Sequence, residues 1–104
     1  RGLGDVYKRQ DGNIKIDRVR RLAFCGDRQL NLTAKEYELL LLLMENKGKS
    51  LKKEWLFNKV WGFDSFSEPQ TLTVHIKWLR EKIEENPKEP KRIITVWGVG
   101  YRWE

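Results

Sequence analysis

The sequence has 104 residues, of which only one is cysteine and three are prolines. It lacks the features that are typical of secreted and membrane proteins. A single thiol, Cys25, cannot form a disulfide within the chain, so we expect a reducing compartment and a small apolar role for it. The apolar run at residues 39–44 is too short to span a bilayer, and the first residues lack the apolar stretch of a secretion signal. We therefore expect no membrane association and a cytoplasmic location.

Groups for catalysis or metal binding are also scarce, because the chain has one histidine. His75 has no second histidine with which to share a metal ion. Nucleophilic catalysis needs a base beside a nucleophile, but His75 and Cys25 fall on unrelated segments. We expect no catalytic residue, no cofactor and no metal, and an enzyme is the weakest of the alternatives.

Positive charge is what the sequence has in excess, with 21 Lys and Arg against 15 Asp and Glu and a net charge of +6. This favours an acidic partner, although such a charge also serves solubility. An apolar content of 39% in a chain of this length allows one modest core. Residues 1–10 show no periodicity, so we expect a frayed or foreign terminus followed by one domain over residues 11–104.

Apolar and polar residues alternate between Gly12 and Leu32, as in strands that bury one face. The alternating pairs are Ile14 and Ile16, Leu22 and Phe24, and Leu30 and Leu32. Turn residues separate them at Asp17-Arg18 and Gly26-Asp27. The pattern predicts a small antiparallel meander with one dry face. Its arginines, at positions 18, 20, 21 and 28, face either solvent or a partner, and a solvated outer face is favoured.

Two helical segments follow the meander. Thr33 and Glu36 form a capping box at the start of the first, which is apolar nearly all round and therefore expected to be buried on most sides. Gly48 suits a left-handed C-cap. Ser50 is expected to cap the second helix, which ends at Gly62.

The segment from Ser67 to Asn86 predicts a helix with one apolar and one polar face. Its apolar stripe, at helical spacings, consists of Leu72, Ile76, Leu79 and Ile83. The opposite face carries Gln70, Val74, Lys77, Trp78 and Glu81, flanked by Thr71, His75 and Arg80. Ser67 and Gln70 form a capping box, and Asn86-Pro87 ends the helix. The outward Trp78 either covers a neighbouring element or touches a partner.

The C-terminal segment has the composition of a β-hairpin. Residues 93–97 are strand formers, Gly98-Val99-Gly100 form a turn, and residues 101–103 return. Three helices, the last half exposed, followed at once by a hairpin make a winged helix-turn-helix. The sequence thus predicts an α+β fold with an N-terminal antiparallel sheet, three helices and a C-terminal hairpin wing.

Four segments carry a family resemblance: LTAKEYELLLLLMENKG, KVWG, TLTVHIKWLREKIE and ITVWGVGYR. Together they resemble the C-terminal effector domain of OmpR/PhoB-family bacterial response regulators, over residues 12–103. The resemblance implies that the output domain of a two-component transcriptional regulator binds specific double-stranded DNA, usually as two protomers head to tail on direct repeats. It also implies that helix 67–86 enters the major groove, wing 93–103 reaches the adjacent minor groove, and loop 62–67 contacts RNA polymerase.

The dimensions of B-DNA make the exposed helix face the readout face, because a helix about 10–12 Å wide fits the major groove. The base-facing residues are Gln70, Val74, Lys77 and Trp78. Thr71, His75 and Arg80 are placed for phosphates, and a neutral hydrogen-bonding role for His75 is equally open. The resemblance adds Thr95 as a phosphate contact and, in the wing, Trp97, Gly98, Gly100 and Arg102.

Two tryptophans depart from the family's pattern, since many members have arginine at the positions of Trp78 and Trp97. Trp97 can stack on a sugar but cannot neutralise a phosphate, and Glu81 would repel one. Residues 70–104 hold seven basic against five acidic residues. We therefore expect modest affinity from one protomer. The alternative is a winged helix that binds a protein in place of DNA, and the loop phenylalanines 63 and 66 either tuck under or await such a partner.

Overall fold

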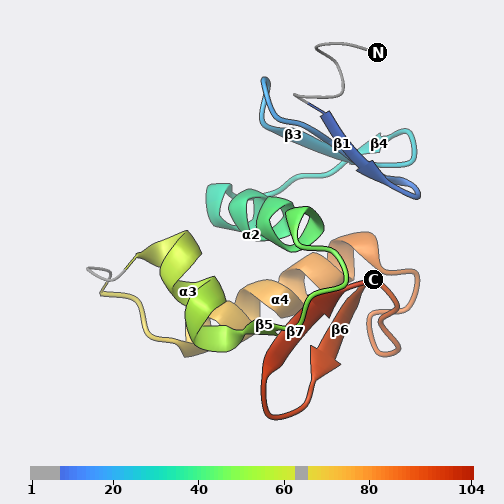
Figure 1. Cartoon of the computed structure of the whole chain (residues 1–104). Helices are drawn as coiled ribbons and strands as arrows, with labels where there is room; N and C mark the ends of the chain where they lie inside the picture. The colour runs from blue at the N-terminus through green and yellow to red at the C-terminus, as the bar shows by residue number, and fades with distance from the viewer. Residues whose placement is uncertain (1–7, 63–65) are drawn as a thin grey trace.

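The computed structural model describes residues 8–62 and 66–104 (Figure 1). Its elements are, in order, β1 (Lys8–Asp11), β2 (Ile14–Asp17), β3 (Leu22–Cys25), β4 (Arg28–Gln29), α2 (Ala34–Glu45), β5 (Leu51–Lys52), α3 (Lys53–Trp61), α4 (Gln70–Ile83), β6 (Ile93–Val96) and β7 (Gly100–Trp103). The strands form two antiparallel sheets, ordered β1-β2-β3-β4 and β5-β7-β6. The helices lie between the N-terminal sheet and the C-terminal hairpin (Figure 1), which confirms the predicted winged-helix fold.

The N-terminal sheet buries a different set of side chains in β3 from the predicted one. Ile14 of β2 is fully buried, as expected, and is opposite Cys25. Ala23 is also buried and shares the core side of β3 with Cys25, so Leu22 and Phe24 project from the other face. The predicted face of β3 was therefore wrong. Pairing with β2 sets the face of β3, and a shift of one residue reverses it.

The first strand lies inside the segment predicted to be a frayed terminus. Residues 8–10 of β1 pair in register with Asp17, Ile16 and Lys15 of β2. The predicted domain start at residue 11 was therefore too late. Residues 8–10 are polar and exposed, so hydrophobic periodicity gave no sign of the strand. Residues 1–7 lie outside the described part of the chain.

Helix α2 forms the centre of the core. The Thr33 hydroxyl accepts the Glu36 N–H at 3.2 Å, and the Glu36 carboxylate accepts the Thr33 N–H at 2.8 Å, which confirms the capping box. Three leucines of α2 are 0% exposed: Leu39, Leu40 and Leu43. The helix packs against α3, α4 and β7. Gly48 follows with φ +82°, the left-handed conformation that was predicted there.

Helix α3 begins later than predicted because its first residues form a strand. Leu51 and Lys52 make up β5, which pairs with β7 of the C-terminal hairpin. The N-cap is Lys52 without a side-chain hydrogen bond, so the predicted cap at Ser50 was wrong. Gly62 ends the helix with φ +85°, as expected.

Helix α4 is shorter than the predicted segment 67–86 at both ends. Its N-cap is Pro69, with no side-chain cap hydrogen bond, so the capping box predicted at Ser67 was wrong. At the other end Glu84 is already extended. Its carboxylate accepts the backbone N–H groups of residues 91–93 at 2.9–3.2 Å. The helix therefore ends where Glu84 turns to hold the connection to β6, ahead of Asn86-Pro87.

Candidate nucleic-acid interface

Helix α4 has the two faces that the sequence predicts. The stripe Leu72, Ile76, Leu79 and Ile83 is at most 6% exposed, which confirms the predicted buried face. On the opposite face, Gln70 and Lys77 are exposed, and Val74 and Trp78 are each 41% exposed. The predicted base-facing residues therefore lie together on an accessible helix surface.

Thr73, for which no role was predicted, also lies on the exposed face of α4. It precedes Lys77 by one helical turn, and residues four apart are neighbours on a helix. That spacing was a sufficient signal to include Thr73 in the candidate interface.

Arg80 joins α4 to the hairpin. Its Nε and Nη2 donate to the Ile93 carbonyl at 3.1 and 2.7 Å, and Nη2 also donates to the Thr95 hydroxyl at 2.9 Å. The guanidinium carbon lies 5.6 Å from the centroid of the Tyr101 ring. Burial lowers the pKa of Arg80 from its usual value. Arg80 and Thr95, both predicted phosphate contacts, thus hold the helix and the wing in a set relation.

His75 stands in a row of aromatic rings between α3 and α4. Its ring centroid is 4.9 Å from that of Trp61, edge-on, and 4.9 Å from that of Trp78, tilted. Nδ1 lies 2.8 Å from the Thr71 carbonyl, which can only accept, so Nδ1 carries the proton. This leaves Nε2 for a further partner. Trp78 therefore both covers a neighbouring side chain and remains partly exposed.

The wing tip is open to a partner. Trp97 is 89% exposed, and Gly98 has φ +80° with open space where a Cβ would lie. Val99 closes the turn, with its N–H donating to the Val96 carbonyl at 3.0 Å. The tip can thus accommodate a close surface without rearrangement.

The other two predicted wing residues have partners within the chain. A Cβ on Gly100 would lie 2.0 Å from the Leu51 carbonyl oxygen, so this glycine permits the close approach of β5. Arg102 forms an ion pair with Glu104. Gly100 is therefore a residue of the hairpin scaffold, and the structure does not bring it to the tip.

A partly buried ion pair fixes the far end of α4. Lys82 Nζ donates to the two carboxylate oxygens of Glu36 at 2.8 and 2.9 Å and to the Asn31 carbonyl at 2.9 Å. Burial alone raises the pKa of Glu36, but the hydrogen bonds from Lys82 and from the Thr33 backbone outweigh it and lower the pKa. The contact ties the C-terminal turn of α4 to the N-terminus of α2.

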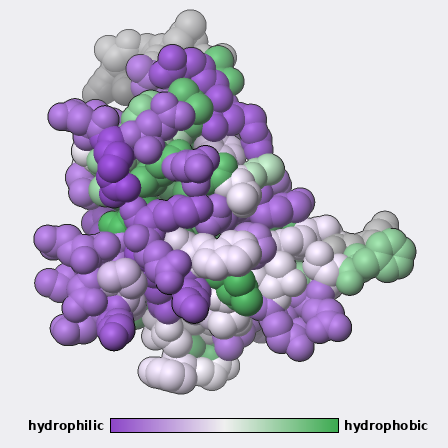
Figure 2. Space-filling view, turned by 180° about the vertical axis from the view of Figure 1, so that it is seen from behind, coloured by the Kyte–Doolittle hydropathy of each residue, from purple (hydrophilic) through white to green (hydrophobic). Residues whose placement is uncertain are grey.

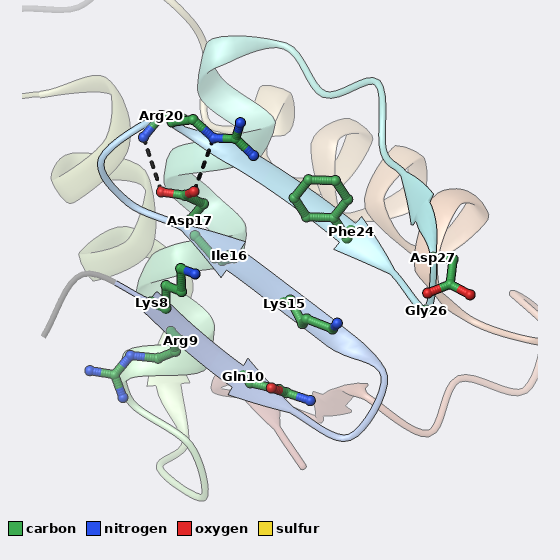
Figure 3. A pocket seen from close by; sticks show the side chains of 10 residues that line it. All are labelled: Lys8, Arg9, Gln10, Lys15, Ile16, Asp17, Arg20, Phe24, Gly26 and Asp27. Atoms are coloured by element: carbon green, nitrogen blue, oxygen red, sulfur yellow. Dashed lines mark hydrogen bonds and ion pairs between the residues drawn. The ribbon is translucent and has the colours of Figure 1, made fainter. Parts of the chain in front are cut away.

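The four arginines of the N-terminal meander are engaged within the chain. Their contacts are Arg18 with Glu45 at 3.5 Å, Arg20 with Asp17 at 3.1 Å, Arg21 at 4.5 Å over the Tyr37 ring, and Arg28 with the Lys82 carbonyl at 3.3 Å. Figure 3 shows the outer face of this sheet, where Lys15 and Phe24 line a hollow of about 360 Å³. This sheet lies at the opposite end of the molecule from the tip of the wing (Figure 1), so its outer face lies away from the predicted readout surface.

Part of the loop predicted to contact RNA polymerase, residues 63–65, lies outside the described residues. Phe66, which follows them, is fully exposed and does not tuck under the domain. Over residues 8–62 and 66–104, no helix is long and apolar enough to cross a bilayer. The same ranges contain no group of three or more His, Cys, Asp or Glu side chains that could hold a metal ion.

Comparisons with known proteins identify the family. The model of the family described as "Transcriptional regulatory protein, C terminal" matches residues 27–103. Regulatory protein VanR of Enterococcus faecium is 46% identical over 82 residues, covering 78% of this chain and 36% of VanR. Sensory transduction protein RegX3 of Mycolicibacterium smegmatis is 40% identical over 93 residues, covering 89% of this chain and 41% of RegX3. The chain thus spans about two fifths of the length of these relatives.

Solved structures agree with this family. The response regulator DrrB of Thermotoga maritima, an OmpR/PhoB homologue, has a TM-score of 0.85 and 36% identity, over 93% of this chain and 44% of DrrB. The DNA-binding domain of Klebsiella pneumoniae RstA, in complex with the RstA box, has a TM-score of 0.82 and 27% identity, over 92% of this chain and 95% of that domain. The chain belongs to the family of C-terminal domains of transcriptional regulatory proteins, the winged-helix type of OmpR/PhoB response regulators, which is a family of regulators and not of enzymes.

Proposed function

We propose that this chain is the output domain of a two-component transcriptional regulator that binds specific double-stranded DNA in the cytoplasm. Helix α4 enters the major groove and the wing reaches the adjacent minor groove. The observation that carries the proposal is α4 itself, with one face sealed against the core and Gln70, Val74 and Lys77 on the exposed face. The RstA domain, which shares this fold, was solved in complex with the RstA box.

The exposed side chains of α4 have the chemistry of direct readout. Lys77 donates to guanine O6 and N7, Gln70 pairs with adenine, and Val74 packs on a thymine methyl group. Trp78 adds an apolar surface next to Val74, where many members of the family have arginine. Gln70 lies at the N-terminus of the helix, which is therefore the end that approaches the bases.

Phosphate contacts flank this face on both sides. Thr71 and His75 lie on the side of α3, and Arg80 and Thr95 lie on the side of the wing. Arg80 uses Nε and Nη2 within the chain, so Nη1 and its two N–H groups are directed to a phosphate. At the wing tip, Trp97 stacks on a sugar in the minor groove.

Two protomers bind head to tail on direct repeats, and this supplies affinity that one protomer lacks. The charge of residues 70–104, seven basic against five acidic, supports only a modest affinity for one copy. The exposed Phe66 supports a contact of loop 62–67 with RNA polymerase.

The alternative is a winged helix that binds a protein through the same face. The exposed side chains of Phe66, Trp78 and Trp97 favour it. Figure 2 shows, on the face turned away from the view of Figure 1, a mostly hydrophilic surface with separate apolar areas, whereas protein-binding sites expose contiguous apolar patches. Titrating a fluorescent duplex at two salt concentrations separates the two, because a module for proteins alone shows no salt-sensitive binding.

The decisive experiment is the Lys77→Ala variant on duplexes selected from a random pool. Losing the guanine contact should cost about 1–3 kcal/mol on the cognate site and relax the preference at one base position. The matched control is Lys15→Ala, which removes an exposed lysine from the outer face of the N-terminal sheet. This variant should bind as the wild type does. If Lys77→Ala binds every duplex as the wild type does, the readout face is misassigned.

A further inference from the structure

A groove of about 590 Å³ separates α4 from the wing and from the connection between α4 and β6. Thr73, Lys77 and Arg80 form its α4 wall, Tyr101 of β7 contributes from the wing, and Lys88 stands on the wall opposite α4. The groove therefore runs along the exposed face of the helix, on the side of the hairpin.

The geometry of a DNA duplex indicates which part of it fits this groove. In a duplex, one sugar–phosphate strand separates each stretch of major groove from the adjacent minor groove. A protein that places α4 in the first and the wing in the second must leave a channel for that strand between the two. The groove lies between α4 and the connection that leads to β6, with Tyr101 as its one lining residue from the wing, and it is open to solvent along the helix.

We propose that this groove seats the sugar–phosphate strand between the two DNA grooves, and that Lys88 and Thr73 contact its phosphates. The proposal rests on the proposed function, and it adds two contacting residues to it. Lys88 belongs to neither the recognition helix nor the wing, so it lay outside both elements that the sequence assigned to DNA.

The charge of the groove matches a phosphate strand. Three cationic side chains line it, Lys77, Arg80 and Lys88, against one anionic side chain, Glu81. The Thr73 hydroxyl lies on the α4 wall as a neutral donor for a phosphate oxygen. Because the hairpin holds Arg80 and Lys77 is assigned to a base, Lys88 is the cationic side chain that adjusts to the strand.

The turn that carries Lys88 is held in place before DNA arrives. The Lys88 N–H donates to the Asn86 side-chain oxygen at 3.1 Å, and the Glu89 N–H donates to the Asn86 carbonyl at 2.9 Å. Beyond the turn, the Glu84 carboxylate binds the next backbone N–H groups. Little backbone conformational entropy is therefore lost when Lys88 meets a phosphate, which favours binding.

Lys88→Ala and Lys91→Ala form a matched pair that tests this proposal. Both lysines are exposed and lie on the same connection, but Lys91 lines a different groove, with Glu84, Glu85 and Glu89. The slope of log Kobs against log salt should fall in magnitude by about 0.9 for Lys88→Ala and stay unchanged for Lys91→Ala. Lys88→Ala should weaken cognate and random duplexes by the same factor, because a phosphate contact carries no sequence information.

Thr73→Val is a second variant that keeps the shape of the side chain. Loss of one hydrogen bond to a phosphate should weaken binding about 3- to 10-fold on all duplexes, with the salt slope unchanged. Thermal unfolding of each variant shows whether the fold is intact.

The result that overturns the groove assignment is a Lys88→Ala protein whose salt slope equals that of the wild type, or a Lys91→Ala protein with the same loss. Either result, in a protein whose Lys77→Ala variant still loses specificity, leaves the proposed function standing. Absence of salt-sensitive duplex binding by the wild type would instead overturn the proposed function together with the groove.

Discussion

Arg80 is the side chain whose role the structure changes most. The Ile93 carbonyl and the Thr95 hydroxyl accept three of its hydrogen bonds, so it couples helix and wing before any phosphate contact is made. Both elements depend on this coupling, because the helix and the wing must meet the duplex at the same time. Arg80, which the sequence predicts to contact a phosphate, therefore also fixes the position of α4 relative to the wing.

The Arg80→Ala variant should bind all duplexes more weakly and by the same factor, since helix and wing lose their set relation. Its free energy of unfolding should fall by about 1–3 kcal/mol, as expected for lost hydrogen bonds from a charged group. Arg80→Lys keeps the charge but cannot span both acceptors, so it should retain the salt slope and lose most of that stability. Denaturant titration of the two variants checks this, and wild-type stability in Arg80→Lys would contradict the coupling.

Asp11 joins three parts of the fold through one carboxylate. It accepts from Trp103 Nε1 at 2.7 Å, from Lys47 Nζ at 3.0 Å and from Arg92 Nη2 at 3.0 Å. Burial alone raises the pKa of Asp11, but these three partners outweigh it and lower the pKa from 3.8 to about 2. The N-terminal sheet, the end of α2 and the C-terminal hairpin therefore meet at an ionised aspartate.

The lowered pKa of Asp11 predicts a loss of stability in acid. Because the folded-state pKa lies below the unfolded one, the stabilisation is complete above pH 4 and disappears as the pH falls from 3.8 towards 2. After screening at this partly exposed site, its size is about 1–2 kcal/mol. Between pH 5 and pH 2.5, the free energy of unfolding of the wild type should therefore fall by this amount more than that of Asp11→Asn. The control Asp27→Asn, on the exposed β3–β4 turn, should show the same fall as the wild type; equal curves for wild type and Asp11→Asn would refute the assignment.

Within the hairpin, two glycines of similar sequence context have different structural demands. Gly98 needs a positive φ but has open space around it, whereas Gly100 leaves room for the Leu51 carbonyl of β5. The hairpin is therefore tied to the segment that precedes α3, and this close contact helps to set its position relative to the helices.

Gly100→Ala should be far more damaging than Gly98→Ala. The first forces β5 and β7 apart, at an expected cost above about 3 kcal/mol in the free energy of unfolding. The second strains one turn residue, at a cost of about 1 kcal/mol, and leaves the fold intact. Thermal or denaturant unfolding of the two variants measures the difference, and similar losses would show that β5 does not constrain the hairpin.

The whole molecule presents a small basic surface and not a strongly charged one. Residues 70–104 hold seven basic against five acidic residues, so we expect one protomer to neutralise on the order of three to five phosphates, and log Kobs should fall against log salt with a slope of about −3 to −5. A duplex with two direct repeats should bind much more tightly than a single site, because the second protomer binds at a high local concentration. Titrations over a salt series on both duplexes test this, and a slope near −10 for one protomer would contradict the contact set.

Local chemistry was enough to predict much of this fold. The capping box at Thr33, the apolar stripe of α4 and the positive φ of Gly48 each depend on residues within a few positions of one another. The exposed face of α4, and with it the candidate readout residues, followed from the position of that stripe. Helix periodicity alone thus led to the accessible placement of Gln70, Val74 and Lys77.

Long-range pairing was needed for the features that were mispredicted or missed. The strand state of residues 51–52 and the buried face of β3 depend on partner strands, and polar β1 becomes a strand only through β2. Arg80 meets acceptors on a different element, and Lys88 meets the α4 groove only after the chain turns back. The pattern of residues along one segment predicts only local structure. These contacts join segments that are distant in the sequence, and the packing of the core decides which of them lie close together in space.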